Sequence, residues 1–138
     1  MVILCILTLC IDPFCGGVQT IDLYKVKVAD LDFESNFTLK VKHDDYIHAF
    51  VSFFDCLFSK CHTKVSFTTA PWGQYTHWKQ TVFYLDECLM ASKGTQIKGH
   101  IKVHHNSKNP RDLDIDIKSK YTSAKAGTVE QERRYFMR

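Results

Sequence analysis

A histidine and a tryptophan stand side by side where a loop enters an apolar strand. His77 and Trp78 lie within residues 74–85, and the Ala-Pro-Trp-Gly sequence of residues 70–73 must be a loop, because proline lacks a backbone donor and glycine permits unusual backbone angles. An indole face attracts a flat cation, and loops carried on a rigid sheet often hold functional residues. Two plainer interpretations remain open: Trp78 as a core or interface residue, and His77 as a loop histidine hydrogen-bonded to backbone.

Cysteines near the middle of the chain raise the question of a metal site. The spacing Cys56-x4-Cys61-His62 suggests zinc, but no second close ligand pair follows, and zinc sites usually have two. Cys56, Cys61 and Cys88 lie inside or beside apolar runs, where a free thiol packs as a small hydrophobic group. The sequence therefore favours free thiols and no metal.

The length and charge of the chain limit the classes of protein to consider. At 138 residues the chain is expected to form one domain, and a hydrophobic fraction of 45% with 24% charged residues is that of an ordinary globular protein. The net charge of +3 is spread along the chain without a basic run, which argues against nucleic-acid binding. Arg133, Arg134 and Arg138 are interpreted as a solvated end.

Short apolar segments separated by turn residues predict a mainly β fold. Residues 46–58 are rich in phenylalanine and β-branched residues, which favours a buried strand over a helix. The absence of a long amphipathic helix in the pattern indicates an antiparallel β-barrel or sandwich. The expected strands cover residues 24–28, 33–42, 46–58, 78–85, 96–104 and 129–137.

Alternating residues predict which side of two strands faces the core. In residues 96–104, apolar side chains and a glycine alternate with polar ones, as in a half-buried antiparallel strand. In residues 112–117, we expect Leu113, Ile115 and Ile117 to point inward. The intervening side chains of Asp112, Asp114 and Asp116 are expected to face water.

The first 20 residues differ from the rest of the chain. Residues 1–11 are almost purely apolar, but this segment is too short to span a bilayer and lacks the basic start and clear cleavage site of a signal peptide. We interpret it as an abnormal N-terminus of a longer protein, with a signal sequence or a native buried strand as alternatives.

The sequence around His77 and Trp78 resembles a known family. Residues 75–84, Tyr-Thr-His-Trp-Lys-Gln-Thr-Val-Phe-Tyr, are similar to the Thr-His-Trp loop of protein arginine N-methyltransferases of the type I kind. Residues 21–28, 45–49, 109–114 and 136–138 also resemble parts of that family's C-terminal barrel domain, in the family's order. The resemblance therefore implies a substrate-binding β-barrel domain over residues 21–138, preceded by an atypical segment at residues 1–20.

The resemblance implies roles for four residues of the loop. Trp78 would supply the aromatic wall of the pocket for the substrate arginine, and His77 would pair with a carboxylate across a domain interface and help to pass a proton. Tyr75 and Thr76 would shape the loop beneath. The implied methyl donor is S-adenosylmethionine, the implied substrates are arginine-rich proteins such as histones or RNA-binding proteins, and the implied location is the cytoplasm and nucleus, without a membrane.

Several parts of the family pattern have no counterpart in this sequence. The six glycines form no cofactor-binding loop, and no glutamate pair or dimerisation arm is recognisable. We therefore expect a fragment of a methyltransferase that binds no cofactor alone, is inactive alone and does not form the family homodimer. A non-catalytic binding or decoy module, for arginine-rich proteins or an intact methyltransferase, is the alternative. A small secreted β-protein with a glycan on Asn36 is a third hypothesis.

Overall fold

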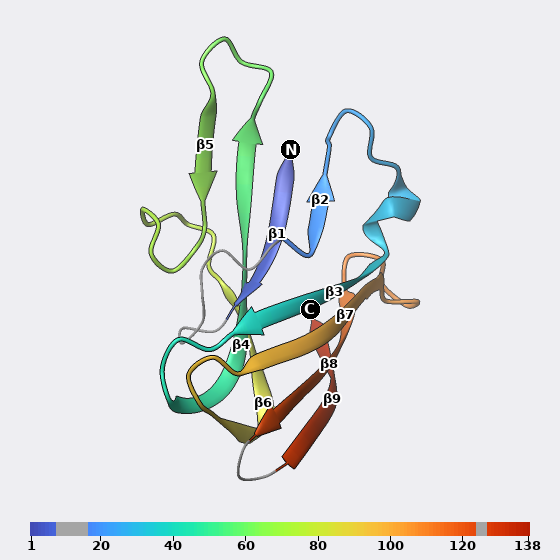
Figure 1. Ribbon diagram of the computed structural model, residues 1–138. Coiled ribbons are helices and arrows are strands. Elements are labelled where there is room, and N and C mark those ends of the chain that lie inside the picture. The colour runs from blue at the N-terminus through green and yellow to red at the C-terminus, as the bar shows by residue number, and fades with distance from the viewer. Residues whose placement is uncertain (8–16, 124–126) are drawn as a thin grey trace.

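The computed structural model describes residues 1–7, 17–123 and 127–138, which form two antiparallel sheets (Figure 1). A 3-10 helix, η1 (Val28–Leu31), precedes the second sheet. The mainly β, barrel-like fold predicted from the sequence is thereby confirmed. The first sheet contains β1 (Val2–Leu7), β2 (Gln19–Ile21), β4 (Asp45–Phe58), β5 (Val65–Thr68) and β6 (Thr81–Ala91), and the second contains β3 (Phe33–Lys40), β7 (Gln96–His105), β8 (Leu113–Ser123) and β9 (Gly127–Met137).

The long strand β4 organises the first sheet. It has 14 residues and pairs with three strands, β1, β5 and β6. One end pairs with β6, with Val51 opposite Val82, and the other end pairs with β5, with Asp55 opposite Thr68. β1 pairs with β4 over residues 51–56. The segment that leads from β5 to β6 therefore begins and ends beside β4.

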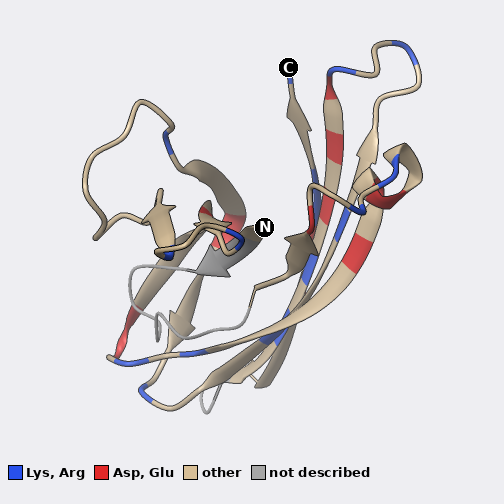
Figure 2. Ribbon diagram, turned by 90° about the horizontal axis from the view of Figure 1, so that it is seen from above, with Lys and Arg blue, Asp and Glu red and all other residues tan. Residues whose placement is uncertain are grey.

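Side chains from both sheets meet in one core. Figure 2 shows the backbone of the two sheets from above. The predicted inward residues of β7 are buried: Ile97 is 0% and Ile101 is 1% exposed. Gly99 lies on the same face, and a Cβ atom there would come within 2.0 Å of the Phe37 ring. Glycine at this position therefore leaves room for a core ring. Other fully buried members of the core are Leu39, Val41, Ile47, Phe50 and Leu89.

Side chains of β9 connect the second sheet to β6 of the first. Tyr135 donates from its hydroxyl to the carbonyl of Tyr84 over 2.6 Å, and Arg133 donates to the same carbonyl over 3.0 Å. Arg133 also forms an ion pair with Asp86 at 2.6 Å. Gln131 donates to the carbonyl of Glu87 over 3.0 Å. These contacts hold the two sheet edges together without a ladder of backbone hydrogen bonds.

The strand expected at residues 24–28 is wrong. The carbonyl of Asp22 accepts from the backbone of Lys25 and Val26, each at 2.9 Å, so the chain turns instead of extending. The carboxylate of Asp30 then accepts from the backbone of Lys27 over 2.9 Å at the start of η1. Local hydrogen bonds of this kind compete with strand pairing. Most side chains of residues 24–28 are exposed to solvent.

Two strands on either side of the Trp78 segment differ from the prediction. β6 begins at Thr81, three residues after the predicted start at Trp78, and continues to Ala91. Trp78 therefore belongs to the loop rather than to the strand. The short strand β5 was not predicted, because its burial is slight and its alternation covers only four residues.

Near the N-terminus, β1 lies between β2 and β4 in the first sheet. β2 spans the predicted boundary at residue 21, and the division of the chain at that residue stays a prediction. Residues 8–16 of the predicted N-terminal segment lie outside the described residues. Within the described part of the chain, no helix is long and apolar enough to cross a membrane.

Candidate functional site

The predicted site residues lie in the segment of residues 69–80, here called the tryptophan loop, which connects β5 to β6. Thr69 is 2% exposed and fastens the start of the loop to β4. Its Oγ1 accepts from the backbone nitrogen of Phe54 over 2.9 Å, and its own backbone nitrogen donates to the Phe54 carbonyl over 2.9 Å. At the other end, Nε2 of Gln80 donates to the Thr69 carbonyl over 2.6 Å. The two ends of the loop are thus joined to each other and to the sheet.

The first half of the tryptophan loop contains a tight turn. The backbone nitrogen of Ala70 donates to Oγ1 of Thr68 over 3.1 Å, and that of Gly73 donates to the Ala70 carbonyl over 2.9 Å. A Cβ atom on Gly73 would lie 2.6 Å from Cγ2 of Thr68. Glycine is therefore required here by the close approach of the Thr68 side chain.

Two tryptophans place the loop on opposite faces of β4. Trp72 contacts Phe53 edge-to-face, with ring centroids 5.4 Å apart, and Trp78 contacts Phe54 in the same way at 5.8 Å. Because Phe53 and Phe54 are consecutive in a strand, their side chains point to opposite faces of the sheet. Phe53 is buried at 5% exposure. The loop therefore spans the edge of β4 and is held on both sides.

Trp78 is the central ring of an aromatic group that remains partly open to solvent. Phe67 of β5 stacks on it with ring centroids 5.5 Å apart and planes 10° from parallel. The His77 ring lies 3.9 Å from Trp78, tilted by 35°. Trp78 is 46% exposed. The protein therefore fixes the indole from beneath while leaving part of it accessible.

The remaining predicted site residues shape the same loop. Oγ1 of Thr76 donates to the Trp78 carbonyl over 3.0 Å. The Lys79 ammonium donates to the Tyr75 hydroxyl over 2.6 Å and lies 4.3 Å from the centre of the Tyr75 ring. Tyr75 is 80% exposed. The structure thus brings Tyr75, Thr76, His77 and Trp78 into one surface loop, and their roles stay predictions.

The carboxylate partner implied for His77 lies across a domain interface, and this pairing stays a prediction. Within the part of the chain that the structure describes, no carboxylate forms an ion pair with His77. Its ring instead lies against Trp78, and its side chain is exposed. A carboxylate partner would therefore have to come from elsewhere.

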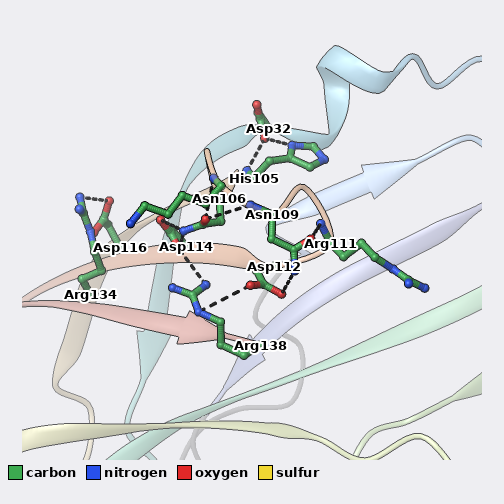
Figure 3. A network of polar contacts seen from close by, with 11 residues as sticks. Asp32, His105, Asn106, Asn109, Arg111, Asp112, Asp114, Asp116, Arg134 and Arg138 are labelled. Atoms are coloured by element: carbon green, nitrogen blue, oxygen red, sulfur yellow. Dashed lines mark hydrogen bonds and ion pairs between the residues drawn. The ribbon is translucent and has the colours of Figure 1, made fainter.

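A second polar cluster, which the sequence did not reveal, surrounds the ends of β7, β8 and β9 (Figure 3). Oδ1 of Asp32 accepts from the backbone nitrogen of His105 over 2.9 Å and lies 2.5 Å from Nδ1 of the same residue. These two hydrogen bonds from His105 hold the pKa of Asp32 below its ordinary value of 3.8. The contact ties the end of η1 to the end of β7.

Asn106 and Arg138 hold Asp114 from two sides (Figure 3). Nδ2 of Asn106 donates to both carboxylate oxygens of Asp114, each at 3.1 Å, and Nη1 of Arg138 donates to Oδ1 over 3.1 Å. The hydrogen bond from Asn106, and then the bond and charge of Arg138, lower the pKa of Asp114. Arg138 also lies 3.8 Å from Asp112. The last residue of the chain is thus anchored to the start of β8.

Asp116 forms a bidentate ion pair with Arg134, which lies opposite it on β9. The Nε and Nη2 atoms of Arg134 donate over 2.6 and 3.0 Å, and this hydrogen-bonded cation lowers the pKa of Asp116. Asp112, Asp114 and Asp116 alternate with the buried Ile115 and Ile117, as predicted, but they are less open to water than expected, with side chains only 19%, 15% and 18% exposed. Arg134 and Arg138 cover them. The spacing of four between these two arginines, opposite three alternating aspartates, is the signal that could have revealed the pairing.

Two cysteines of the Cys56-x4-Cys61-His62 spacing lie at one cavity. Cys56 and Cys61 both line a surface cavity of about 310 Å³, and both are free thiols, as is Cys88. Among the described residues, no group of three or more histidine, cysteine, aspartate or glutamate side chains is placed to hold a metal ion.

Comparison with known proteins assigns the family. Residues 8–124 match the family model described as the arginine methyltransferase oligomerization subdomain. This chain belongs to the arginine methyltransferase family. Protein arginine N-methyltransferase 1 of Caenorhabditis elegans is 53% identical over 100 residues, which cover 72% of this chain and 29% of the relative. The same-named protein of Chlamydomonas reinhardtii is 44% identical over 130 residues, covering 92% of this chain and 37% of the relative.

Solved structures of the family share the fold. The chain matches the PRMT1 enzyme-prozyme heterotetrameric complex of Trypanosoma brucei with AdoHcy at a TM-score of 0.83 and 32% identity, over 88% of this chain and 38% of that one. Arabidopsis thaliana protein arginine methyltransferase 10 matches in fold at a TM-score of 0.81 and 20% identity, over 89% of this chain and 38% of that one. The chain thus spans about three tenths of the first curated relative. The matching family model is described as an oligomerization subdomain. This description does not support the expectation that the chain forms no family homodimer.

The described residues do not fit S-adenosylmethionine. A nucleotide-like cofactor is commonly held by a glycine-rich turn that leads from a strand into a helix. Here Gly94 and Gly127 have positive φ angles of 87° and 71° outside any helix, and Gly73 and Gly99 are required by nearby side chains.

Proposed function

We propose that this chain is the substrate-side part of a protein arginine N-methyltransferase, which transfers the methyl group of S-adenosylmethionine to a guanidinium nitrogen of a protein arginine. Membership of the family supports the class of reaction. The observation that carries the assignment of the site is the partly exposed indole of Trp78 on a loop anchored at both ends. The proposed substrates are arginine-rich proteins of the histone or RNA-binding kind, in the cytoplasm and nucleus.

The chemistry of the guanidinium explains why an aromatic wall is useful. The group keeps its positive charge at neutral pH, and it is flat, so it gains from stacking on an indole. Trp78 would provide that surface, while Thr76 and Tyr75 would hold the loop in shape. His77, beside the indole, would pair with a carboxylate contributed from outside this chain.

The aspartates of this chain are poor candidates for steering the guanidinium. Asp32, Asp114 and Asp116 each already bind a donor from the chain itself. Both the steering carboxylates and the methyl donor would therefore come from a separate cofactor-binding part. We propose that the 138-residue chain is inactive when that part is missing.

A reconstitution experiment tests this proposal. Methyl transfer from labelled S-adenosylmethionine to an arginine-rich peptide would be measured for the chain alone, and for the chain mixed with the separately expressed cofactor-binding part of the nematode relative. We expect no transfer by the chain alone, transfer by the mixture, and at least about tenfold slower transfer with Trp78→Ala, because the guanidinium loses its oriented surface. Trp72→Ala is the matched control for removing an indole from the same loop. Equal rates for both variants would contradict the assignment of Trp78.

The alternative proposal is a binding or decoy module that pairs with an intact methyltransferase. The description of the matching region as an oligomerization subdomain favours it. Size-exclusion chromatography of the chain mixed with an intact family enzyme tests this alternative. Co-elution with reduced methylation by that enzyme would support it, and separate elution would contradict it.

A further inference from the structure

The rings of Phe54, Phe67 and Trp78 form one mutually packed aromatic group. Phe54 is edge-on to both Phe67 and Trp78, at centroid distances of 6.3 and 5.8 Å and angles of 73° and 74°. Phe67 and Trp78 are nearly parallel. Edge-to-face and offset-stacked arrangements are the favourable geometries for aromatic pairs. The three rings therefore define one orientation of the indole plane.

Phe67 lies on a strand that does little else for the fold. β5 has four residues, of which Val65 is 54% exposed and Ser66 is also exposed. None of the described residues of β5 belongs to either hydrophobic core. The main packing contact that this strand offers is the stacking of Phe67 on Trp78. Thr69, which follows the strand directly, then fixes the loop to β4 through Phe54.

We propose that Phe67 is a positioning residue that sets the plane of the Trp78 indole in the site for the substrate arginine. A ring stacked 5.5 Å away and 10° from parallel fixes the plane of the indole, whereas the His77 ring, 3.9 Å from Trp78, is tilted by 35°. This inference rests on the proposed function. It adds that β5 serves to orient the arginine site.

Phe54 and Thr69 have a different part in this arrangement. Phe54 meets Trp78 edge-on, so it limits how deeply the indole packs against β4 but makes no parallel contact with its plane. Thr69 joins the backbone of Phe54 to Gln80, which closes the loop. Only Phe67 lies parallel to the indole among these residues, so its loss should change orientation more than overall folding.

The first test measures the orientation of Trp78 without a ligand. In a Trp72→Phe background, which keeps a ring on Phe53, Trp78 is the only indole that fluoresces. We expect Phe67→Leu to raise the rate of acrylamide quenching about twofold and to weaken the near-ultraviolet circular dichroism, and Phe67→Tyr to restore both. Phe58→Leu is the control, since Phe58 is a phenylalanine at the end of β4, 48% exposed, that lies opposite Val65 of the same strand β5. Unchanged quenching with Phe67→Leu would overturn the proposal.

The second test measures the consequence for arginine. Binding of an arginine- and glycine-rich peptide would be followed by the fluorescence of Trp78, with the lysine counterpart of the peptide as reference. We expect Phe67→Leu to weaken arginine binding about 2- to 10-fold, the range that aromatic pairs contribute, and to leave the weaker lysine binding unchanged. A reoriented indole with unchanged arginine affinity would overturn the positioning role. Failure of the unsubstituted chain to prefer arginine would instead contradict the proposed function, so the two failures are distinguishable.

Discussion

Gln80 closes the tryptophan loop by donating from Nε2 to the carbonyl of Thr69 over 2.6 Å. Every polar atom of Thr69 therefore takes part in a hydrogen bond, because its backbone nitrogen and Oγ1 already bond to the backbone of Phe54. The loop that carries the candidate site is thus closed through a single buried threonine. This arrangement allows a surface segment of polar and aromatic residues to keep one conformation.

Thr69→Val should destabilise the protein and loosen the loop. The valine has a similar shape but leaves the backbone nitrogen of Phe54 without its 2.9 Å acceptor, and an unpaired buried donor costs about 1–3 kcal/mol. The free energy of unfolding from urea denaturation, together with hydrogen exchange of the loop amides, measures both effects. Thr69→Ser keeps the hydroxyl and should lose much less. Equal losses for the valine and serine variants would contradict the account.

Gly99→Ala should be destabilising unless Phe37 is made smaller. The new methyl group would come within 2.0 Å of the Phe37 ring, and overpacking of a core typically costs about 1–3 kcal/mol. In the double variant with Phe37→Leu, the two changes should be less costly together than the sum of each alone, because they share one space. Thermal or urea unfolding of the four proteins measures this coupling. Additive effects would show that Phe37 does not occupy the position above Gly99.

Acid should destabilise the protein partly through Asp116. Its pKa is lowered in the folded state from an ordinary value of 3.8, chiefly by the hydrogen bond from Arg134. The ion pair therefore contributes stability above pH 3.8, and this contribution is lost as the pH falls through the lower folded pKa. Between pH 5 and about pH 2, the free energy of unfolding of the Asp116→Asn variant should fall less than that of the unsubstituted chain. Urea unfolding across this range measures both. Parallel pH profiles would contradict the pairing.

Tyr135→Phe should weaken the closure between the two sheets. The hydroxyl donates to the Tyr84 carbonyl over 2.6 Å, and a typical hydrogen bond contributes about 0.5–1.5 kcal/mol. The partly buried ring, which packs on Phe83 with ring centroids 5.0 Å apart, would stay in place. The free energy of unfolding measures the loss. Tyr84→Phe is the control, because the bond uses the Tyr84 carbonyl and not its exposed side chain.

Most of the fold could be predicted because its strands carry regular alternation. In β7 the buried Ile97 and Ile101 occupy the expected face, since the side-chain period of two is visible in the sequence. The alternation of residues 24–28 was misleading, because hydrogen bonds donated by the backbone of Lys25 and Val26 to the Asp22 carbonyl turn the chain there. Local polar contacts of this kind leave little trace in a hydrophobic pattern.

The position of the candidate site in the chain could be predicted from the sequence, but the residues that support it could not. The combination of Pro71, Gly73 and the adjacent His77 and Trp78 indicated a loop of functional interest. Its support comes from residues distant in the chain, such as Phe54, which only strand pairing places beside it. The aspartates of β8 likewise seemed solvated until the pairing with β9 placed Arg134 opposite Asp116.

The most direct measurement is the nuclear magnetic resonance signal of the Trp78 indole N–H during titration with an arginine-rich peptide. The account predicts a progressive shift of this signal, a much smaller shift of the Trp72 signal, and a weaker response to a lysine-rich peptide of equal charge, because a flat guanidinium stacks on the indole better than an ammonium does. An unchanged Trp78 signal, or equal responses to arginine and lysine, would contradict the claim that this indole forms the arginine site.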